Sequence, residues 1–348
     1  MTALPTASRG RADRTDRGAT PGRSGRRRTP VTVAILVAAL LAVCVASVLL
    51  GSRWIPAGTL FDSSAELHGI AAARLDRTLL GLAVGGALGL VGALMQGLTR
   101  NPLADPGILG INAGAAFAMV LALSVFGISD LHGYVWFAFL GAAVAMVLVH
   151  AVAALGRDGA TPMKIAIAGA ALTAAVTSWT SGVLITDRQT MEAFRYWQVG
   201  TVGGRGEVLM TGLPFLVVGA VLGLACARSL NALALGEDLA RGLGRRVNLD
   251  RLVIGLAAVL LAGGATALAG PIAFVGLIVP HAVRAVVGPD YRKVLPLSLG
   301  YGAVLVVAAD VVGRLVLPPS EVQVGIMTAV IGVPVFISLI RRGRMGAL

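Results

Sequence analysis

Residues 101–114 read NPLADPGILGINAG and stand between two long apolar runs. Twenty uncharged residues precede Thr99, and more than twenty follow Asp105. Pro102 and Pro106 prevent helix continuation, and the side chains of Asn101 and Asp105 can satisfy backbone groups in a turn. The stretch therefore predicts a rigid turn between two membrane spans, formed by these four residues.

The composition of the whole chain agrees with spans on both sides of this turn. Its 348 residues are 56% hydrophobic and 13% charged, and the mean hydropathy is +0.84. A soluble domain carries about 25% charged residues. The chain is therefore predicted to be an all-α, polytopic membrane protein.

The apolar runs are numerous enough for ten membrane spans. A bilayer core needs roughly 20 apolar residues per helix. The uncharged stretch 252–283 is too long for one span, and Gly270-Pro271 divides it into a span and a shorter, broken one. The other eight expected spans are 31–51, 79–98, 107–129, 133–156, 165–186, 208–227, 294–313 and 322–340.

The basic residues predict the orientation, because Lys and Arg near spans remain preferentially in the cytoplasm. With both termini inside, all but seven of the 29 Lys and Arg fall on the cytoplasmic side. Residues 1–30 are rich in Arg, Gly, Thr and Pro, which predicts a disordered basic tail near the anionic headgroups of the membrane lipid. No aromatic residues interleave its arginines, which disfavours nucleic-acid binding. The expected domains are this tail, a membrane domain over 31–343 and a C-terminal tail over 344–348.

Two side-chain patterns mark helix faces within the spans. Gly81, Gly85 and Gly89 recur every four residues, which predicts a smooth face for close helix packing. A polar stripe on the span 165–186 has two interpretations that stay open. Its hydroxyls either line a pathway or donate to the carbonyls one turn earlier on their own helix. The stripe consists of Thr173, Thr177, Thr180 and Ser181.

Ionisable groups within spans are costly and usually functional, and only Asp310 and His150 lie well inside the expected spans. Arg314 is one turn from Asp310 on the same helix face, so the two are expected to pair. An ion-coupled carrier would need more buried carboxylates than this. The sequence also shows no metal-ligand cluster, no nucleophile with a base and no Walker loop. We therefore expect neither an enzyme nor a chain with its own cofactor or energy source.

Three blocks of the sequence resemble the FecCD-type permeases, the membrane subunits of ATP-binding-cassette importers for iron-siderophores, haem and vitamin B12. They are RLDRTLLGLAVGGALGLVGALMQGLTRNPLADPGILGINAG (74–114), GPIAFVGLIVPHAVR (270–284) and VGIMTAVIGVPVFISLIRR (324–342). The resemblance implies a type II importer permease of ten helices in the bacterial inner (cytoplasmic) membrane, with the turn at 101–106 joining the second and third helices.

The resemblance also implies the partners and the cargo. A permease of this family forms a homodimer, or pairs with a paralogous permease, around a central pathway. Two cytoplasmic ATPase subunits bind ATP and Mg, and an extracytoplasmic substrate-binding lipoprotein delivers the cargo. The expected cargo is an Fe(III)-siderophore, with cobalamin or haem as the alternative. An ion-coupled secondary transporter is the alternative from another class.

By the same resemblance, Arg74, Arg77 and Arg314 are the expected docking residues for the binding protein, because guanidinium forks suit carboxylate partners. The sequence departs from the family pattern at Asp76 and Gln323, where the family usually has proline. Asp76 is expected to neutralise part of the charge of its neighbours.

The segment LGEDLARGLGRRV (235–247) resembles the ATPase-coupling helices of the family, within a cytoplasmic loop over about 229–250. Its leucines recur at one-turn spacing on a face that could enter a groove of the partner, and a solvated amphipathic loop is the alternative. The expected coupling residues are Gly236, Glu237, Asp238, Leu239, Arg241, Leu243 and Gly244. The candidate gate residues before the fifth span are Thr161, Pro162 and Met163.

Overall fold

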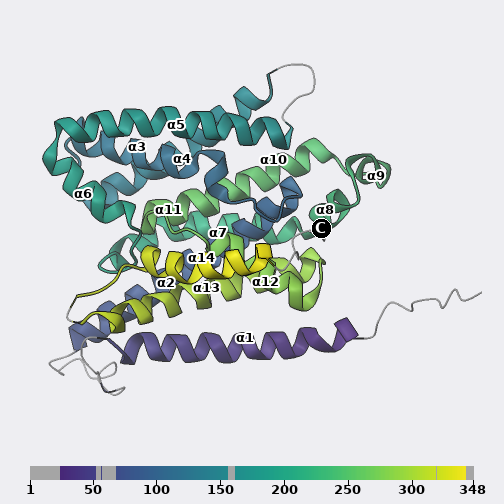
Figure 1. Ribbon diagram of the computed structural model, residues 1–348, viewed down its shortest axis with the longest axis horizontal. Helices are drawn as coiled ribbons and strands as arrows, with labels where there is room; N and C mark the ends of the chain where they lie inside the picture. The colour runs from purple at the N-terminus through teal and green to yellow at the C-terminus, as the bar shows by residue number, and fades with distance from the viewer. Residues whose placement is uncertain (1–23, 52–55, 57–67, 156–160, 319, 342–348) are drawn as a thin grey trace, which may run out of the picture.

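The computed structural model describes residues 24–51, 56, 68–155, 161–318 and 320–341. The expected C-terminal tail and most of the expected N-terminal tail lie outside these residues. Over the described ranges the chain is all helical, as predicted, and its helices run nearly parallel to one another (Figure 1). The α-helices are α1 (Ser24–Leu49), α2 (His68–Thr99), α3 (Ile111–Ser124), α4 (Leu131–Ala153), α5 (Pro162–Thr186), α6 (Arg188–Gln198), α7 (Leu209–Ala225), α8 (Ala227–Ala234), α9 (Glu237–Gly242), α10 (Val247–Ala258), α11 (Gly264–Ala269), α12 (Val275–Val287), α13 (Tyr291–Val316) and α14 (Val324–Arg341).

The helices account for the ten predicted spans. Within the described ranges, seven helical segments are long and apolar enough to cross a bilayer, and three shorter apolar helices coincide with α3, α12 and the main part of α14. The span predicted at the start of 252–283 is built from α10, the π-helical turn η4 (Val259–Gly263) and α11. Short α6, α8 and α9 lie between the spans and were not predicted as membrane segments.

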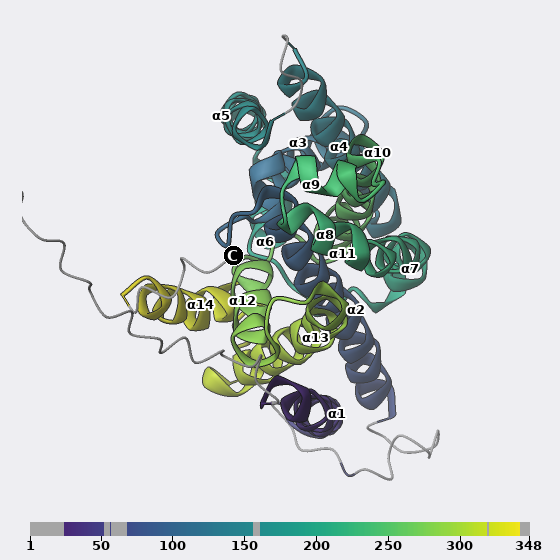
Figure 2. The same cartoon turned by 90° about the vertical axis from the view of Figure 1, so that its right-hand side faces the viewer.

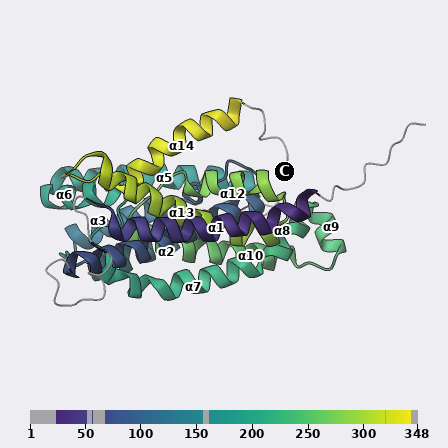
Figure 3. The same ribbon diagram turned by 90° about the horizontal axis from the view of Figure 1, so that it is seen from below.

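The centre of the bundle is the pair α2 and α13, which pack along their length (Figure 3). The predicted glycine face makes this contact. A Cβ atom at Gly85 would lie 2.5 Å from the carbonyl oxygen of Gly302, and one at Gly89 would lie 2.1 Å from that of Ser298. Only a hydrogen atom fits in place of a side chain at these positions. The glycine face therefore serves helix packing, as in other close membrane-helix pairs.

The turn after α2 has local causes that the sequence contained. Asn101 Oδ1 accepts from the backbone N–H of Leu103 at 2.9 Å, and Asp105 Oδ1 accepts from that of Gly107 at 2.8 Å. Pro106 begins the short 3-10 helix η2 (Pro106–Leu109), which ends at Gly110 with φ 73°. Burial raises the pKa of Asp105, and the hydrogen bond from Gly107 opposes the rise. Side-chain capping and a left-handed glycine therefore turn the chain into α3.

The span predicted to be broken at Gly270-Pro271 is broken there by backbone geometry. Gly270 has φ 76°, and Phe274 has φ 68° immediately before α12. A positive φ is uncommon for a bulky residue. The Phe274 side chain lies against α14, where a Cβ at Gly332 would stand 2.5 Å from the Phe274 Cβ.

Several helices extend further than the apolar runs predicted, and α1 and α2 do so by the most residues. α1 begins at Ser24 rather than at residue 31, so the end of the expected disordered tail is helical, and α2 begins at His68 rather than at residue 79. The added residues include charged side chains, which the search for uncharged runs had excluded. In end view, α5 and α14 lie on one side of the bundle, and α7 and α10 lie on the other (Figure 2).

Candidate functional site

The segment around α9 exposes large apolar side chains outside the spans. The chain enters this helix through Gly236, with φ 114°, and leaves it through Gly244, with φ 79°. Leu235, Leu239 and Leu243 have exposed fractions of 61%, 61% and 65%. We call these three side chains the leucine face. α9 projects from the end of the bundle beside α8 (Figures 1 and 2).

Ion pairs hold the leucine face in place from its edges. Arg241 pairs with Glu237 at 3.4 Å and with Asp238 at 3.5 Å, both within α9. Glu237 also pairs with Arg251 at the start of α10. Because the charges lie beside the leucines, α9 is fixed to α10 while its apolar side chains remain in solvent.

The base of this segment is fixed by a second set of polar contacts. Arg245 pairs with Asp250 at 2.6 Å, and Ser229 on α8 donates to the same carboxylate at 3.0 Å. Asn231 Nδ2 donates to Asp290 at 2.8 Å, and Asn231 Oδ1 accepts from the backbone N–H of Tyr291 at 3.0 Å. The loop is therefore tied to the first turns of both α10 and α13.

The three arginines expected on the outer surface lie at the opposite end of the bundle, and two of them are buried. The exposed fractions of Arg74 and Arg314 are 8% and 2%. Arg77 places its guanidinium against Asp310, with Nε 2.9 Å from Oδ2 and Nη2 2.7 Å from Oδ1. Its Nη1 donates to Glu321 at 2.6 Å. We call these three arginines with Asp310 and Glu321 the arginine cluster.

The arginine cluster also fixes the last turn of α1. Arg314 donates to the carbonyl oxygen of Ser47 at 2.9 Å, and Arg74 donates to that of Val48 at 3.1 Å. These carbonyls are among the last four of the helix, which have no partner within it. The expected pair of Arg314 and Asp310 is present at 3.2 Å.

The three expected docking residues thus contact other parts of the chain, and Arg74 and Arg314 are buried. Buried charges need partners, and Asp310, Glu321 and the end of α1 supply them. Asp76 does not neutralise its neighbours through an ion pair within the described part of the chain, since it is exposed and Arg77 pairs with Asp310 and Glu321. Gln323 immediately precedes α14, which begins at Val324 without the proline of the family pattern.

The polar stripe on α5 is divided between its two interpretations. Thr180 donates to the carbonyl of Val176 at 2.8 Å, and Ser181 donates to that of Thr177 at 3.0 Å. These two hydroxyls satisfy their own helix, whereas the Thr177 side chain is exposed on a helix that lies at the edge of the bundle (Figure 2). Thr173 is half-buried and faces Gly110.

The candidate gate residues form the start of α5. Thr161 is its N-cap and accepts from the backbone N–H of Lys164 at 3.3 Å, Pro162 is at the first helical position, and Met163 is 74% exposed. The sequence analysis missed Glu321 and Arg251, whose partners come from other segments of the chain. The only signal at Glu321 was its place beside the departure at Gln323.

An all-helical bundle with helices of membrane-spanning length defines the class of multi-pass membrane proteins. The model of the FecCD transport family matches residues 37–342. The chain belongs to this family, and it is a permease subunit of the ATP-binding-cassette importer type.

Individual relatives agree over nearly the whole chain. The probable siderophore transport system permease protein YfiZ of Bacillus subtilis is 44% identical over 319 residues, which cover 90% of this chain and 96% of that protein. The ferric enterobactin transport system permease protein FepD of Escherichia coli is 42% identical over 328 residues, or 91% and 98% of the two chains. A solved metal-chelate type ABC transporter in an inward-facing conformation is similar with a TM-score of 0.79 at 28% identity, covering 90% of this chain and 99% of its own.

Proposed function

We propose that this chain moves a ferric siderophore across the bacterial cytoplasmic membrane as the permease of an importer whose ATP is hydrolysed by separate subunits. The observation that carries the proposal is the leucine face. Three exposed leucines, one on a six-residue helix and one just beyond each of its ends, would be unfavourable in water, and burial of each large apolar side chain contributes about 1.5–3 kcal/mol. A cytoplasmic ATPase that covers them supplies both the burial and the driving force that the described residues do not provide.

The position of α9 supports its role as the transmission point. α1 begins at the end of the bundle that carries α8 and α9, and α14 runs toward the same end (Figures 1 and 3). If the ATPase sits at this end, both termini are cytoplasmic, as the basic residues predict. Movement of α9 would then pass through Glu237 and Arg251 to α10, and through Asn231 and Asp290 to α13.

A second permease, either a copy of this chain or a paralogue, is proposed to face α5 and α14. Both helices lie at the edge on the same side of the bundle (Figure 2), and α5 exposes Met163, Ile167, Trp179 and Ile185. The exposed Thr177 and the half-buried Thr173 are our candidates for the pathway wall between the two permeases.

At the opposite end, an extracytoplasmic binding protein is proposed to dock above the arginine cluster. Arg74, Arg77 and Arg314 stay the candidate residues, with a condition set by their pairing. A docking carboxylate reaches Arg77 by replacing Glu321, whose side chain is 41% exposed, because Asp310 is 4% exposed.

The test places a charge on the leucine face. Leu239→Asp should abolish retention of the ATPase on co-purification and stop ATP-dependent uptake of radiolabelled ferric enterobactin or ferric citrate, because an unpaired charge buried in an apolar contact costs several kcal/mol. Tyr196→Asp is the matched control, since Tyr196 is 71% exposed on α6, away from α9 (Figure 1). It should retain the ATPase.

Normal ATPase retention and uptake by Leu239→Asp would contradict α9 as the contact. Uptake of labelled cobalamin or haem in place of every ferric siderophore tested would leave the importer standing and overturn the proposed cargo.

A further inference from the structure

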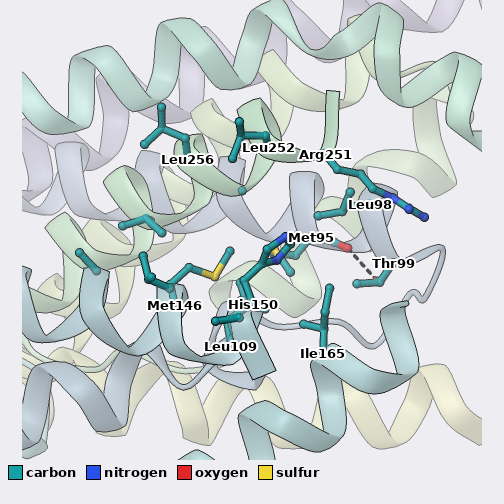
Figure 4. A pocket seen from close by; sticks show the side chains of 15 residues that line it. Met95, Leu98, Thr99, Leu109, Met146, His150, Ile165, Arg251, Leu252 and Leu256 are labelled. Carbon is teal, nitrogen blue, oxygen red and sulfur yellow. Dashed lines mark hydrogen bonds between the residues drawn. The ribbon is translucent and has the colours of Figure 1, made fainter. Parts of the chain in front are cut away.

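A cavity of about 490 Å³ opens between α4 and α10, near the end of the bundle that carries α8 and α9 (Figure 4). Its size falls within the range of about 300–1,000 Å³ that is usual for ligand sites. The walls come from α2, η2, α4, α5, α10 and η4 and are almost entirely apolar. Their larger side chains are Met95, Leu98, Leu109, Met146, Ile165 and Leu256.

The mouth of the cavity lies on the apolar flank of the spans. Val147 on α4 and Leu252 and Leu256 on α10 line it, and their exposed fractions are 66%, 63% and 50%. Helical faces this apolar are covered by lipid tails in a bilayer. The exposed part of the cavity lining therefore lies where a lipid tail can reach it.

The polar lining is confined to one end. His150 is in the last turn of α4 and Arg251 is in the first turns of α10 (Figure 4). Thr99 also lines the cavity, but its hydroxyl already donates to the carbonyl of Met95 at 2.7 Å. The Arg251 side chain is 25% exposed, so a ligand can reach its guanidinium.

We propose that this cavity binds an anionic phospholipid, with an acyl chain between α4 and α10 and the phosphate on Arg251. An apolar slot that opens to the bilayer, with cationic and imidazole groups only at its interfacial end, has the polarity of such a lipid from tail to head. A guanidinium fork matches phosphate geometry, and the N-terminus of α10 adds a favourable dipole.

The phosphate meets one competitor on the protein. Glu237 of α9 pairs with Arg251, whereas Asp250 is held by Arg245 and Ser229. A phosphate on Arg251 therefore shares or replaces the contact with Glu237. This competition separates a lipid site from a purely structural ion pair, because the two residues of the pair affect a bound lipid in opposite directions.

The experiment uses the full chain in nanodiscs of equal parts phosphatidylglycerol and phosphatidylcholine, and counts retained lipids by native mass spectrometry after extraction. Arg251→Gln should weaken retention of one phosphatidylglycerol by about tenfold or more, the loss expected for a charge-assisted contact. Glu237→Gln should retain it at least as tightly as the unaltered chain. Arg292→Gln is the matched control, since Arg292 starts α13 and lines a different groove.

A second variant tests the acyl slot separately. Gly255 lines the cavity, and a Cβ there would meet only the flexible end of Met146 at 3.3 Å, so Gly255→Phe should fill the space and displace the same lipid. If Arg251→Gln and Gly255→Phe both retained the phosphatidylglycerol as tightly as the unaltered chain, the site would be overturned. The anionic headgroup contact would be overturned if the unaltered chain retained phosphatidylcholine as tightly as phosphatidylglycerol. It would also be overturned if Arg251→Gln and Glu237→Gln lost phosphatidylglycerol to the same extent.

Discussion

The two ends of this bundle carry the side chains that the sequence linked to partner proteins, and they are built in opposite ways. In the arginine cluster, Arg314 and Asp310 are almost fully buried and form an ion pair with each other. On α9, the leucines are exposed and the charges lie at the edges in solvent. Sequence motifs place both regions among partner contacts, but only α9 leaves a surface without a partner in the described chain. The arginine cluster acts first as an internal clamp on α1.

The sharpest test of this comparison removes the shared carboxylate of the clamp. Asp310→Asn should destabilise the chain by about 3–5 kcal/mol, because the buried charge of Arg314 would lose its counter-charge and Arg77 would retain only Glu321. The midpoint of thermal loss of the monodisperse peak in detergent would measure it. Asp238→Asn, at a fully exposed carboxylate on α9, should change stability by less than about 1 kcal/mol. Similar shifts for the two variants would remove the distinction between the regions.

A smaller effect is expected when the charge is kept and only the fork is lost. Arg314→Lys retains a cation beside Asp310 but cannot keep every bond to the Ser47 carbonyl and hydroxyl, so we expect a loss of about 1–3 kcal/mol in the same assay. Arg241→Lys on α9 is the matched exchange at an exposed pair, and its effect should stay below about 0.5 kcal/mol. If Arg314→Lys left the stability unchanged, the cluster would need only a positive charge at this position and not the guanidinium fork.

The smallest effect on the melting temperature is expected from a change in the geometry that presents the leucine face. Gly236→Ala forces a residue with a Cβ to adopt φ 114°, in open space, which costs about 1–3 kcal/mol locally. Since α9 projects from the bundle, this should appear as weaker ATPase binding rather than a lower melting temperature. Gly242→Ala, within the helix and also in open space, should leave binding unchanged or slightly stronger. A lower melting temperature with unchanged ATPase binding would contradict the local role of Gly236.

The spans and the turn were predictable because the bilayer imposes a length on each apolar run and prolines mark the turn within a few residues. The break at Gly270 followed for the same reason. The start of α2 at His68 was not predictable, because its charged turns depend on partners far along the chain. Arg77 and Asp310 are 233 residues apart, and no local sequence pattern predicts their ion pair.

The candidate sites divide along the same line. The leucine spacing and the glycines around α9 are local, so the sequence predicted this helix and its apolar face. The burial of Arg74 and Arg314 depends on the C-terminal turn of α1, and the contact of Arg251 with Glu237 depends on how α9 folds back on α10. Residue type alone did not distinguish a clamp from a docking surface.

The fork between Arg77 and Asp310 also sets an order on assembly. At synthesis rates of roughly 5–20 residues per second, the 233 residues between them take about 10–50 s to emerge. Until then the glycine face of α2 has no α13 to pack against, and Arg77 has no Asp310. The central pair of this protein is therefore closed late, after α3 to α12 have emerged and before α14, and the first turns of α2 must wait at the membrane surface for α13.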